Sequence, residues 1–123
     1  MKICVTASTN TIDAQIDPRF GRCAYLIIVD SETMQFEAIP NLASGASGGA
    51  GIQAAQTVAN KGAKVLLTGD VGPNAFQALS AAGIDVVTGV SGTVKDAIEK
   101  FKRGEFKKTG APTVGEHAGK AQG

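Results

Sequence analysis

The chain has 123 residues, enough for one domain with a substantial core and too few for a second independent domain. Its 12 basic and 11 acidic residues leave a net charge of +1, so it lacks the basic surface with which proteins bind nucleic acid or an anionic membrane. No apolar run reaches 18 residues and Met1 leads directly into an apolar segment, so we expect a cytoplasmic protein with no nucleic-acid or membrane partner.

The first 40 residues predict three strands. Short apolar runs at 3–5 and 24–29 are typical of buried strands. Residues 36–39 follow the second run after a short turn-like link, so the second and third strands should form a hairpin. A polar loop, 9–21, separates the first two strands. Loops of this length in compact domains are often functional.

The second half of the chain alternates helices with strands. Apolar residues at helical spacing from Ile52 predict a helix that ends before Gly62. The unbroken apolar run 65–67 predicts a strand covered on both faces, which we place at the centre of the sheet. Pro73 suits the first position of a second helix, which should end at Gly83. The remaining expected elements are a strand at 84–87 and an amphipathic helix at 94–103.

This order of elements predicts an α/β fold in which a mixed five-stranded sheet carries helices on both faces. We expect one domain over residues 1–104. Residues 105–123 have almost no apolar periodicity, so they should form a flexible C-terminal tail. His117, the only histidine in the sequence, falls in this tail and should be a surface residue.

Three loops that contain glycine could meet where the strands end: 17–23, 45–51 and 69–74. Glycine lets backbone amides approach an anion, and the helix that begins at Pro73 would present its partly positive end there. We expect Gly72 to need a positive φ or a close backbone neighbour. The alternative is that these glycines only make turns. No nucleotide-binding glycine pattern is present.

The two cysteines have different settings in the sequence. Cys4 lies within an apolar strand and should be a small buried hydrophobe. Cys23 follows Arg19 and Arg22, whose guanidinium groups would favour the thiolate, the form that binds metal. The alternative for Cys23 is a half-buried thiol at a strand edge. Two cysteines are too few for a disulfide framework or a zinc site, which fits a reducing compartment.

The sequence lacks the residue sets of common catalytic sites. No Ser-His-Asp set can be assembled without the histidine of the tail, and there is no H-E-x-x-H motif or nucleophile elbow. Asp30, Asp70 and Asp85 are too scattered to hold two metal ions. We therefore expect a protein that is not an enzyme.

Two segments resemble the signatures of the dinitrogenase iron–molybdenum cofactor biosynthesis family. The first is Asp-Pro-Arg-Phe-Gly-Arg-Cys at 17–23, before an apolar strand. The second is Gly-Asp-Val-Gly-Pro-Asn-Ala-Phe at 69–76, followed by Leu79 and Gly83. The resemblance extends over residues 1 to about 102. It implies a ribonuclease H-like fold with three layers, and a carrier or chaperone of a cofactor precursor in place of a nuclease.

The resemblance also implies a binding site and a ligand. The ligand would be an anionic iron–sulfur cluster or an iron–molybdenum cofactor precursor. Many members have histidines where this chain has Arg19 and the 45–51 loop, so the cluster should be cradled by amides and arginines, with Cys23 as the candidate metal ligand. The expected site residues are Arg19, Phe20, Gly21, Arg22, Cys23, Gly69, Gly72, Pro73 and Asn74.

The resemblance also implies a protein partner in cofactor assembly, and we expect the carrier to be a monomer. A different class of function stays open at this point. Because the expected histidines are absent, the same loops could serve a protein–protein interaction or regulatory domain without a bound cofactor.

Overall fold

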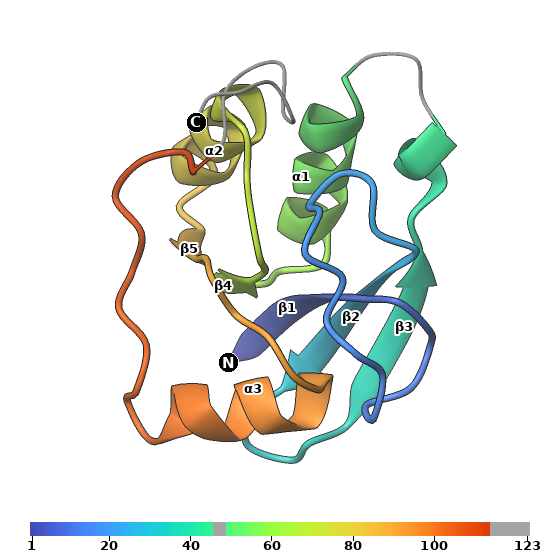
Figure 1. Ribbon diagram of the computed structural model, residues 1–123, viewed down its shortest axis with the longest axis vertical. Helices are drawn as coiled ribbons and strands as arrows, with labels where there is room; N and C mark the ends of the chain where they lie inside the picture. Colours follow the sequence, from blue (N-terminus) through green and yellow to red (C-terminus); the bar gives the residue numbers. More distant parts are fainter. Residues whose placement is uncertain (46–48, 114–123) are drawn as a thin grey trace.

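The computed structural model describes residues 1–45 and 49–113, which form one mixed sheet of five strands flanked by helices. Helices α1 and α2 cover one face of the sheet, and α3 covers the other (Figure 1). The expected α/β fold in three layers is therefore confirmed. The strands are β1 (Lys2–Ala7), β2 (Tyr25–Asp30), β3 (Phe36–Pro40), β4 (Val65–Leu67) and β5 (Asp85–Val87); the helices are α1 (Ala50–Asn60), α2 (Pro73–Ala81) and α3 (Val94–Lys102), with a short 3₁₀ helix η1 (Leu42–Gly45).

The strand order is β3-β2-β1-β4-β5, so the central strand is β1. Placing β4 at the centre was wrong. Strand β1 has six residues and pairs on both sides, antiparallel with β2 and parallel with β4. Strand β4 has three residues and also pairs with β5 in parallel. The hairpin of β2 and β3 is confirmed, and the order is compatible with a ribonuclease H-like topology.

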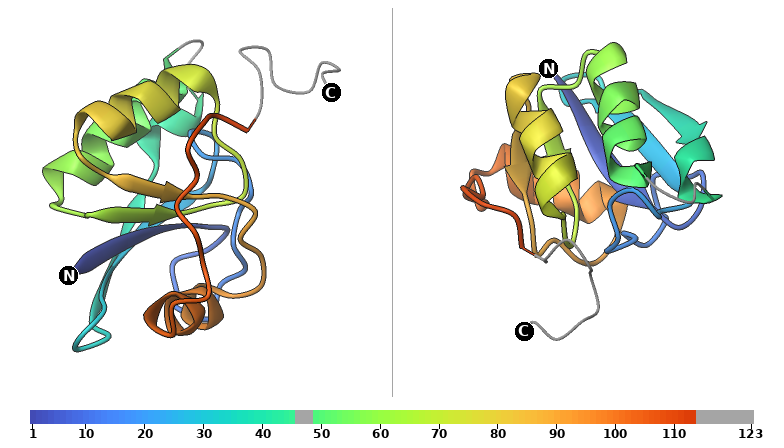
Figure 2. Two further views of the ribbon diagram at one scale, coloured as in Figure 1. Left: turned by 90° about the vertical axis from the view of Figure 1, so that its left-hand side faces the viewer. Right: turned by 90° about the horizontal axis from the view of Figure 1, so that it is seen from above.

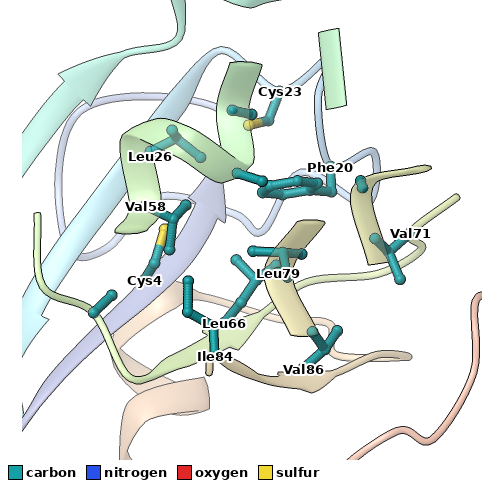
Figure 3. Close-up of a cluster of buried hydrophobic side chains, with 14 of the residues drawn as sticks. Cys4, Phe20, Cys23, Leu26, Val58, Leu66, Val71, Leu79, Ile84 and Val86 are labelled. Atoms are coloured by element: carbon teal, nitrogen blue, oxygen red, sulfur yellow. The ribbon is translucent and has the colours of Figure 1, made fainter. Parts of the chain in front are cut away.

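The sheet divides the apolar side chains into two cores, because successive residues of a strand point to opposite faces. Cys4 of β1 points to the core beneath α1 and α2, whereas Ile3 and Val5 point to the core beneath α3. Figure 3 shows the first core, where Cys4 and Cys23 lie among leucine, valine and phenylalanine side chains. The expectation that Cys4 is a buried hydrophobe is confirmed.

Glycines end the helices as the sequence predicts. Gly62, Gly83 and Gly104 follow α1, α2 and α3 with φ values of 78°, 76° and 75°. A left-handed residue directly after a helix lets its last carbonyls find backbone donors, and glycine adopts that conformation without a clash.

Two segments without regular structure are nevertheless bound to the sheet region. Residues of the 9–21 loop make bridges from Ile16 to Ala7 and from Gln15 to Thr93. Part of the expected tail, residues 105–113, makes hydrogen bonds to the end of β5 and to the loop before α2. His117 and the middle of the 45–51 loop lie outside the described residues. In the described ranges no helix has the length and apolarity needed to cross a bilayer.

Candidate functional site

The structure brings the 17–23 loop and the 69–74 loop together. Arg19 and Asp70 form a parallel bridge, in which the Phe20 amide donates to the Asp70 carbonyl at 3.3 Å. The Asp70 amide donates to the Pro18 carbonyl at 2.7 Å. The two loops come from the ends of β1 and β4, which are parallel neighbours. They therefore leave the same edge of the sheet.

Gly69 is the residue that permits this close approach. A Cβ atom on Gly69 would lie 2.6 Å from the Pro18 Cα and 2.8 Å from its carbonyl oxygen, distances that real Cβ atoms do not reach. Gly72 has a φ of −82°, so the expectation of a positive φ there was wrong. Gly72 is instead the N-cap of α2 in an extended conformation, which is the usual backbone of that position.

The third loop meets the other two through small residues. Gly21 has a φ of 95°, and a Cβ atom there would lie 3.0 Å from the Gly51 Cα. A Cβ on Gly51 would lie 2.9 Å from the Ala75 Cβ. Gly51 is in the first turn of α1 and Ala75 is in the first turn of α2. The N-termini of both helices therefore lie side by side, next to the Gly21 turn.

Among the described residues, no side chain caps the N-terminus of α1 or α2. Their N-cap residues are Gly49 and Gly72, and neither helix has an acidic residue in its first turn. Helix α3 is different: the Thr93 hydroxyl accepts a hydrogen bond from the Asp96 amide, and Asp96 adds a negative charge. The first turns of α1 and α2 thus have backbone amides that no capping side chain among the described residues binds, and the partial positive charges of both helix N-termini lie next to each other.

Arg19 places a guanidinium beside the two helix N-termini, and the Asp17 carboxylate that it binds offsets part of its charge. Its guanidinium Nε and Nη2 donate to the two carboxylate oxygens of Asp17, each at 3.2 Å. The Asp17 side chain is only 8% exposed, whereas that of Arg19 is 66% exposed. The hydrogen bonds and the charge of Asp17 raise the pKa of Arg19. Asp17 therefore holds the arginine in one orientation at the surface.

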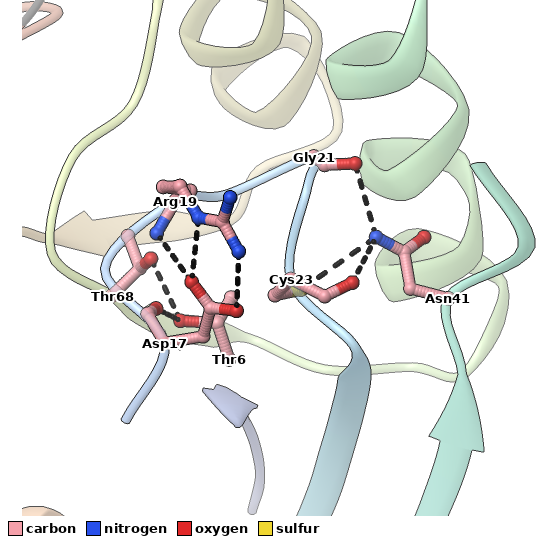
Figure 4. A network of polar contacts seen from close by, with 7 residues as sticks. All are labelled: Thr6, Asp17, Arg19, Gly21, Cys23, Asn41 and Thr68. Atoms are coloured by element: carbon pink, nitrogen blue, oxygen red, sulfur yellow. Dashed lines mark hydrogen bonds and ion pairs between the residues drawn. The ribbon is translucent and has the colours of Figure 1, made fainter. Parts of the chain in front are cut away.

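A buried network beneath Arg19 fixes the backbone of its loop (Figure 4). The Thr6 hydroxyl donates to the Asp17 carbonyl at 2.6 Å, and it lies 2.8 Å from the Thr68 hydroxyl. The Thr6 carbonyl accepts from the Asp17 amide at 3.0 Å. Neither threonine was an expected site residue. Both follow the apolar part of a strand at the edge where the loops meet, and this position was the signal that could have identified them.

Asn41 holds the other end of the loop (Figure 4). Its side-chain Nδ2 donates to the carbonyls of Gly21 and Cys23 at 3.1 and 3.0 Å, and it lies 3.6 Å from the Cys23 sulfur. Asn41 is buried and follows β3 directly, far from the loop in sequence. Only the folded β2–β3 hairpin brings it there.

Cys23 is a buried thiol, so the expectation of a thiolate was wrong. Its exposed fraction is 0%, and its side chain lies in the core beneath α1 and α2. Burial and the negative charge of Asp17 raise its pKa to about 12. Arg19 is turned toward Asp17 at the surface, and its weak attraction to Cys23 does not offset the burial that disfavours a thiolate. Phe20 is buried in the same core, and Arg22 is exposed on the turn between them.

Gly69, Gly72, Pro73 and Asn74 lie along the second loop, as expected from the sequence. Pro73 occupies the first position of α2, and Asn74 is exposed in its first turn. Across residues 1–45 and 49–113, no three histidine, cysteine, aspartate or glutamate residues are grouped to hold a metal ion. The described site therefore offers amides and a guanidinium, and it offers no set of metal ligands.

The fold and this site define a small α/β protein in which glycine-containing loops and two open helix N-termini meet at one edge of the sheet. The chain belongs to the family described as dinitrogenase iron-molybdenum cofactor, whose model matches residues 1–104. The expected family is thereby confirmed, with a match that ends two residues after α3.

Three relatives show how far the similarity extends. The apo form of the orange protein from Desulfovibrio gigas is 47% identical, covers 91% of this chain and 95% of its own, and superposes with a TM-score of 0.89. A NifB-like protein from Thermotoga is 32% identical over 87% of this chain and 91% of its own, with a TM-score of 0.76. An uncharacterised protein from Methanocaldococcus jannaschii is 30% identical over 88% of this chain and 91% of its own.

Proposed function

We propose that this protein is a non-catalytic carrier that binds an anionic metal–sulfur cluster, or a precursor of the iron–molybdenum cofactor, without covalent bonds. The observation that carries the proposal is the meeting of the α1 and α2 N-termini, neither of which has a capping side chain or an acid. Membership of a family named for the iron–molybdenum cofactor supports this kind of ligand. A relative called the orange protein, solved in its apo form, supports a coloured bound group.

The binding chemistry follows from the donors at the site. The second and third amides of each helix have no partner within the helix, and here they belong to Gly51 and Ile52 in α1 and to Asn74 and Ala75 in α2. Sulfide ligands of a metal cluster accept hydrogen bonds from amides, and such bonds tune cluster chemistry. The two helix ends and Arg19 would balance the negative charge of the cluster.

The absence of a protein thiolate suits a carrier. A cluster bound through several cysteine sulfurs is exchanged only after those bonds break, whereas a hydrogen-bonded anion leaves intact. Cys23 would then shape the loop from within the core and would not ligate metal.

We propose that the protein acts in the cytoplasm as a monomer and passes its cargo to a protein partner in cofactor assembly. Its two free cysteines fit a reducing compartment.

The experiment is an anaerobic titration of the protein with tetrathiomolybdate, a coloured dianion of molybdenum and sulfide, followed by its visible absorption. We expect saturable binding that weakens as the salt concentration rises, since salt screens charge at an exposed site. Arg19→Gln should weaken binding by about fivefold, the effect of one partly screened charge. Cys23→Ser should leave binding within about twofold, as expected for a buried group with a neutral thiol.

Arg103→Gln is the matched control. Arg103 also pairs with a carboxylate two residues away, with its Nε 2.6 Å from a Glu105 oxygen, but it follows α3 on the opposite face of the sheet. It should bind tetrathiomolybdate as the unsubstituted protein does. No saturable binding by the unsubstituted protein would refute the proposal, and equal losses in the two arginine variants would refute the role of Arg19.

A protein-interaction domain without a cofactor is the second candidate, and exposed apolar side chains favour it. Leu42 of η1 is 91% exposed and Ile52, in the first turn of α1, is 39% exposed. Because η1 contacts α1, these side chains flank the same loop. If this candidate is correct, Leu42→Ser and Ile52→Ser abolish capture of a protein partner, and tetrathiomolybdate does not bind. Capture that persists in both variants would show that these side chains are not the interface, and failure of the unsubstituted chain to capture any partner would remove the candidate.

A further inference from the structure

Residues 105–113, which we call the strap, run from the end of α3 past the outer strand β5 to the loop before α2. Figure 2 shows this segment passing from the face that carries α3 to the face that carries α2. Along the way it is attached to β5: the Thr109 amide donates to the Val86 carbonyl at 2.6 Å, and the Thr109 and Thr88 hydroxyls lie 2.8 Å apart. The Lys108 ammonium lies 3.4 Å from an Asp85 carboxylate oxygen.

The strap ends on the candidate site loop at Val71. The Thr113 amide donates to the Val71 carbonyl at 2.9 Å, and the Thr113 hydroxyl accepts from the Val71 amide at 2.9 Å. That hydroxyl also lies 3.4 Å from a carboxylate oxygen of Asp70. The strap therefore binds both polar backbone atoms of Val71, directly before the N-cap of α2.

The Asp70–Val71 backbone is thus held from two sides. Pro18 and Phe20 bind Asp70 on one side, and Thr113 binds Val71 on the other. The Val71 side chain is 1% exposed and packs in the core beneath α1 and α2. A loop fixed at successive residues presents the next backbone groups, at the start of α2, in one arrangement. Ligand donors held in place before binding lose less entropy when the ligand arrives.

We infer that the strap is a reversible clamp that positions the N-terminus of α2 for its ligand, with Thr113 as a positioning residue. This inference rests on the proposed function for its ligand. The family match ends at residue 104, so the clamp lies outside the part of the chain that the family model describes. By linkage, a ligand that binds the clamped loop more tightly also stabilises the docked strap by the same factor.

The composition of the strap explains why its docking is reversible. Phe106 is its one large apolar side chain, and it is only partly buried beneath α3. The other attachments described above are hydrogen bonds and an exposed ion pair, which stabilise a surface segment weakly. A surface hollow of about 390 Å³ lies where Lys108 and Gly110 pass Phe76 and Ile84. The middle of the strap is therefore not closely packed against α2.

The test compares Thr113→Val with the unsubstituted full-length chain. Valine has a similar shape but removes the hydroxyl that binds the Val71 amide. Hydrogen exchange measured by NMR on the protein without added ligand should become about fivefold faster at Val71, the factor expected for one hydrogen bond of ordinary strength. Tetrathiomolybdate affinity should fall by a similar factor, and added tetrathiomolybdate should slow exchange of the Thr113 amide in the unsubstituted protein.

Thr33→Val is the control, because Thr33 lies in the β2–β3 turn, where its hydroxyl accepts from the nearby Gln35 amide. It should alter neither measurement. Unchanged exchange at Val71 in Thr113→Val would overturn the clamp, whatever the protein binds. Faster exchange with unchanged affinity would overturn its positioning role and leave the proposed function standing. Absence of tetrathiomolybdate binding by the unsubstituted chain would refute the proposed function, while exchange at Val71 would still decide whether Thr113 holds the loop.

Discussion

Gly69→Ala should be among the most destabilising single-methyl substitutions in this chain. The added Cβ would lie 2.6 Å from the Pro18 Cα and 2.8 Å from the Pro18 carbonyl oxygen, so backbone must move to admit it. That movement separates the loops whose bond from the Asp70 amide to Pro18 is 2.7 Å long. Forcing extra volume into a packed region costs about 1–3 kcal/mol, and each lost hydrogen bond adds about 1 kcal/mol. We expect a loss of about 3 kcal/mol in unfolding free energy.

Urea denaturation followed by circular dichroism measures this loss, and thermal unfolding should show a midpoint lower by roughly 10 °C for a domain of this size. Gly45→Ala is the matched control, because no atom of the residues that the structure describes lies within 4 Å of a Cβ built on Gly45, and its φ is not positive. Alanine at such a site changes stability by less than about 1 kcal/mol. A loss below 1 kcal/mol for Gly69→Ala would show that the two loops separate freely, and it would refute the close approach as a requirement of the site.

Two further predictions concern buried polar groups. Burial raises the pKa of Cys23 from 9.0 to about 12, because the folded protein disfavours the charged thiolate. The stability that the neutral thiol contributes is therefore fully present below pH 9, and it is lost as the pH rises toward 12. The unfolding free energy from urea titrations should therefore fall above pH 9, and less steeply in Cys23→Ala; equal slopes would contradict the assigned burial. Thr6→Val should cost about 1–3 kcal/mol because it leaves Thr68 without its hydroxyl partner. In a double-mutant cycle with Thr68→Val the two losses should be less than additive, and full additivity would mean that the hydroxyls do not interact.

Most of the fold could be predicted because its signals are local. Apolar runs identify buried strands, and Gly62 or Pro73 mark helix ends through backbone preferences that do not depend on distant residues. The order of strands is not local. The runs of β1 and β4 are both fully apolar, so burial alone could not show that β1 lies at the centre.

The candidate site was predictable to the level of loops and not of side chains. Parallel strands deliver their following loops to the same edge, which is why 17–23 and 69–74 were expected to meet. The environment of Cys23 depends on Asn41, which turns the loop so that the sulfur enters the core. The positions of glycines in the sequence likewise do not show which glycine lacks room for a Cβ atom. Pro18 crowds Gly69, and only the folded chain brings them together.

The contrast among the three helices connects stability with function. An N-cap threonine or serine stabilises a helix by about 0.5–2 kcal/mol relative to alanine and by only about a few tenths of a kcal/mol relative to glycine, and α3 has such a cap in Thr93. Helices α1 and α2 have glycine at the same position, so the chain leaves that stabilisation unused at the two N-termini that touch each other. A serine or aspartate cap would bind the same amides that an incoming anion needs. We therefore interpret the absence of capping side chains as a small loss of stability that keeps the amide donors free for a ligand. The attachments at Pro18, Asn41 and Thr113 hold the surrounding loops in place.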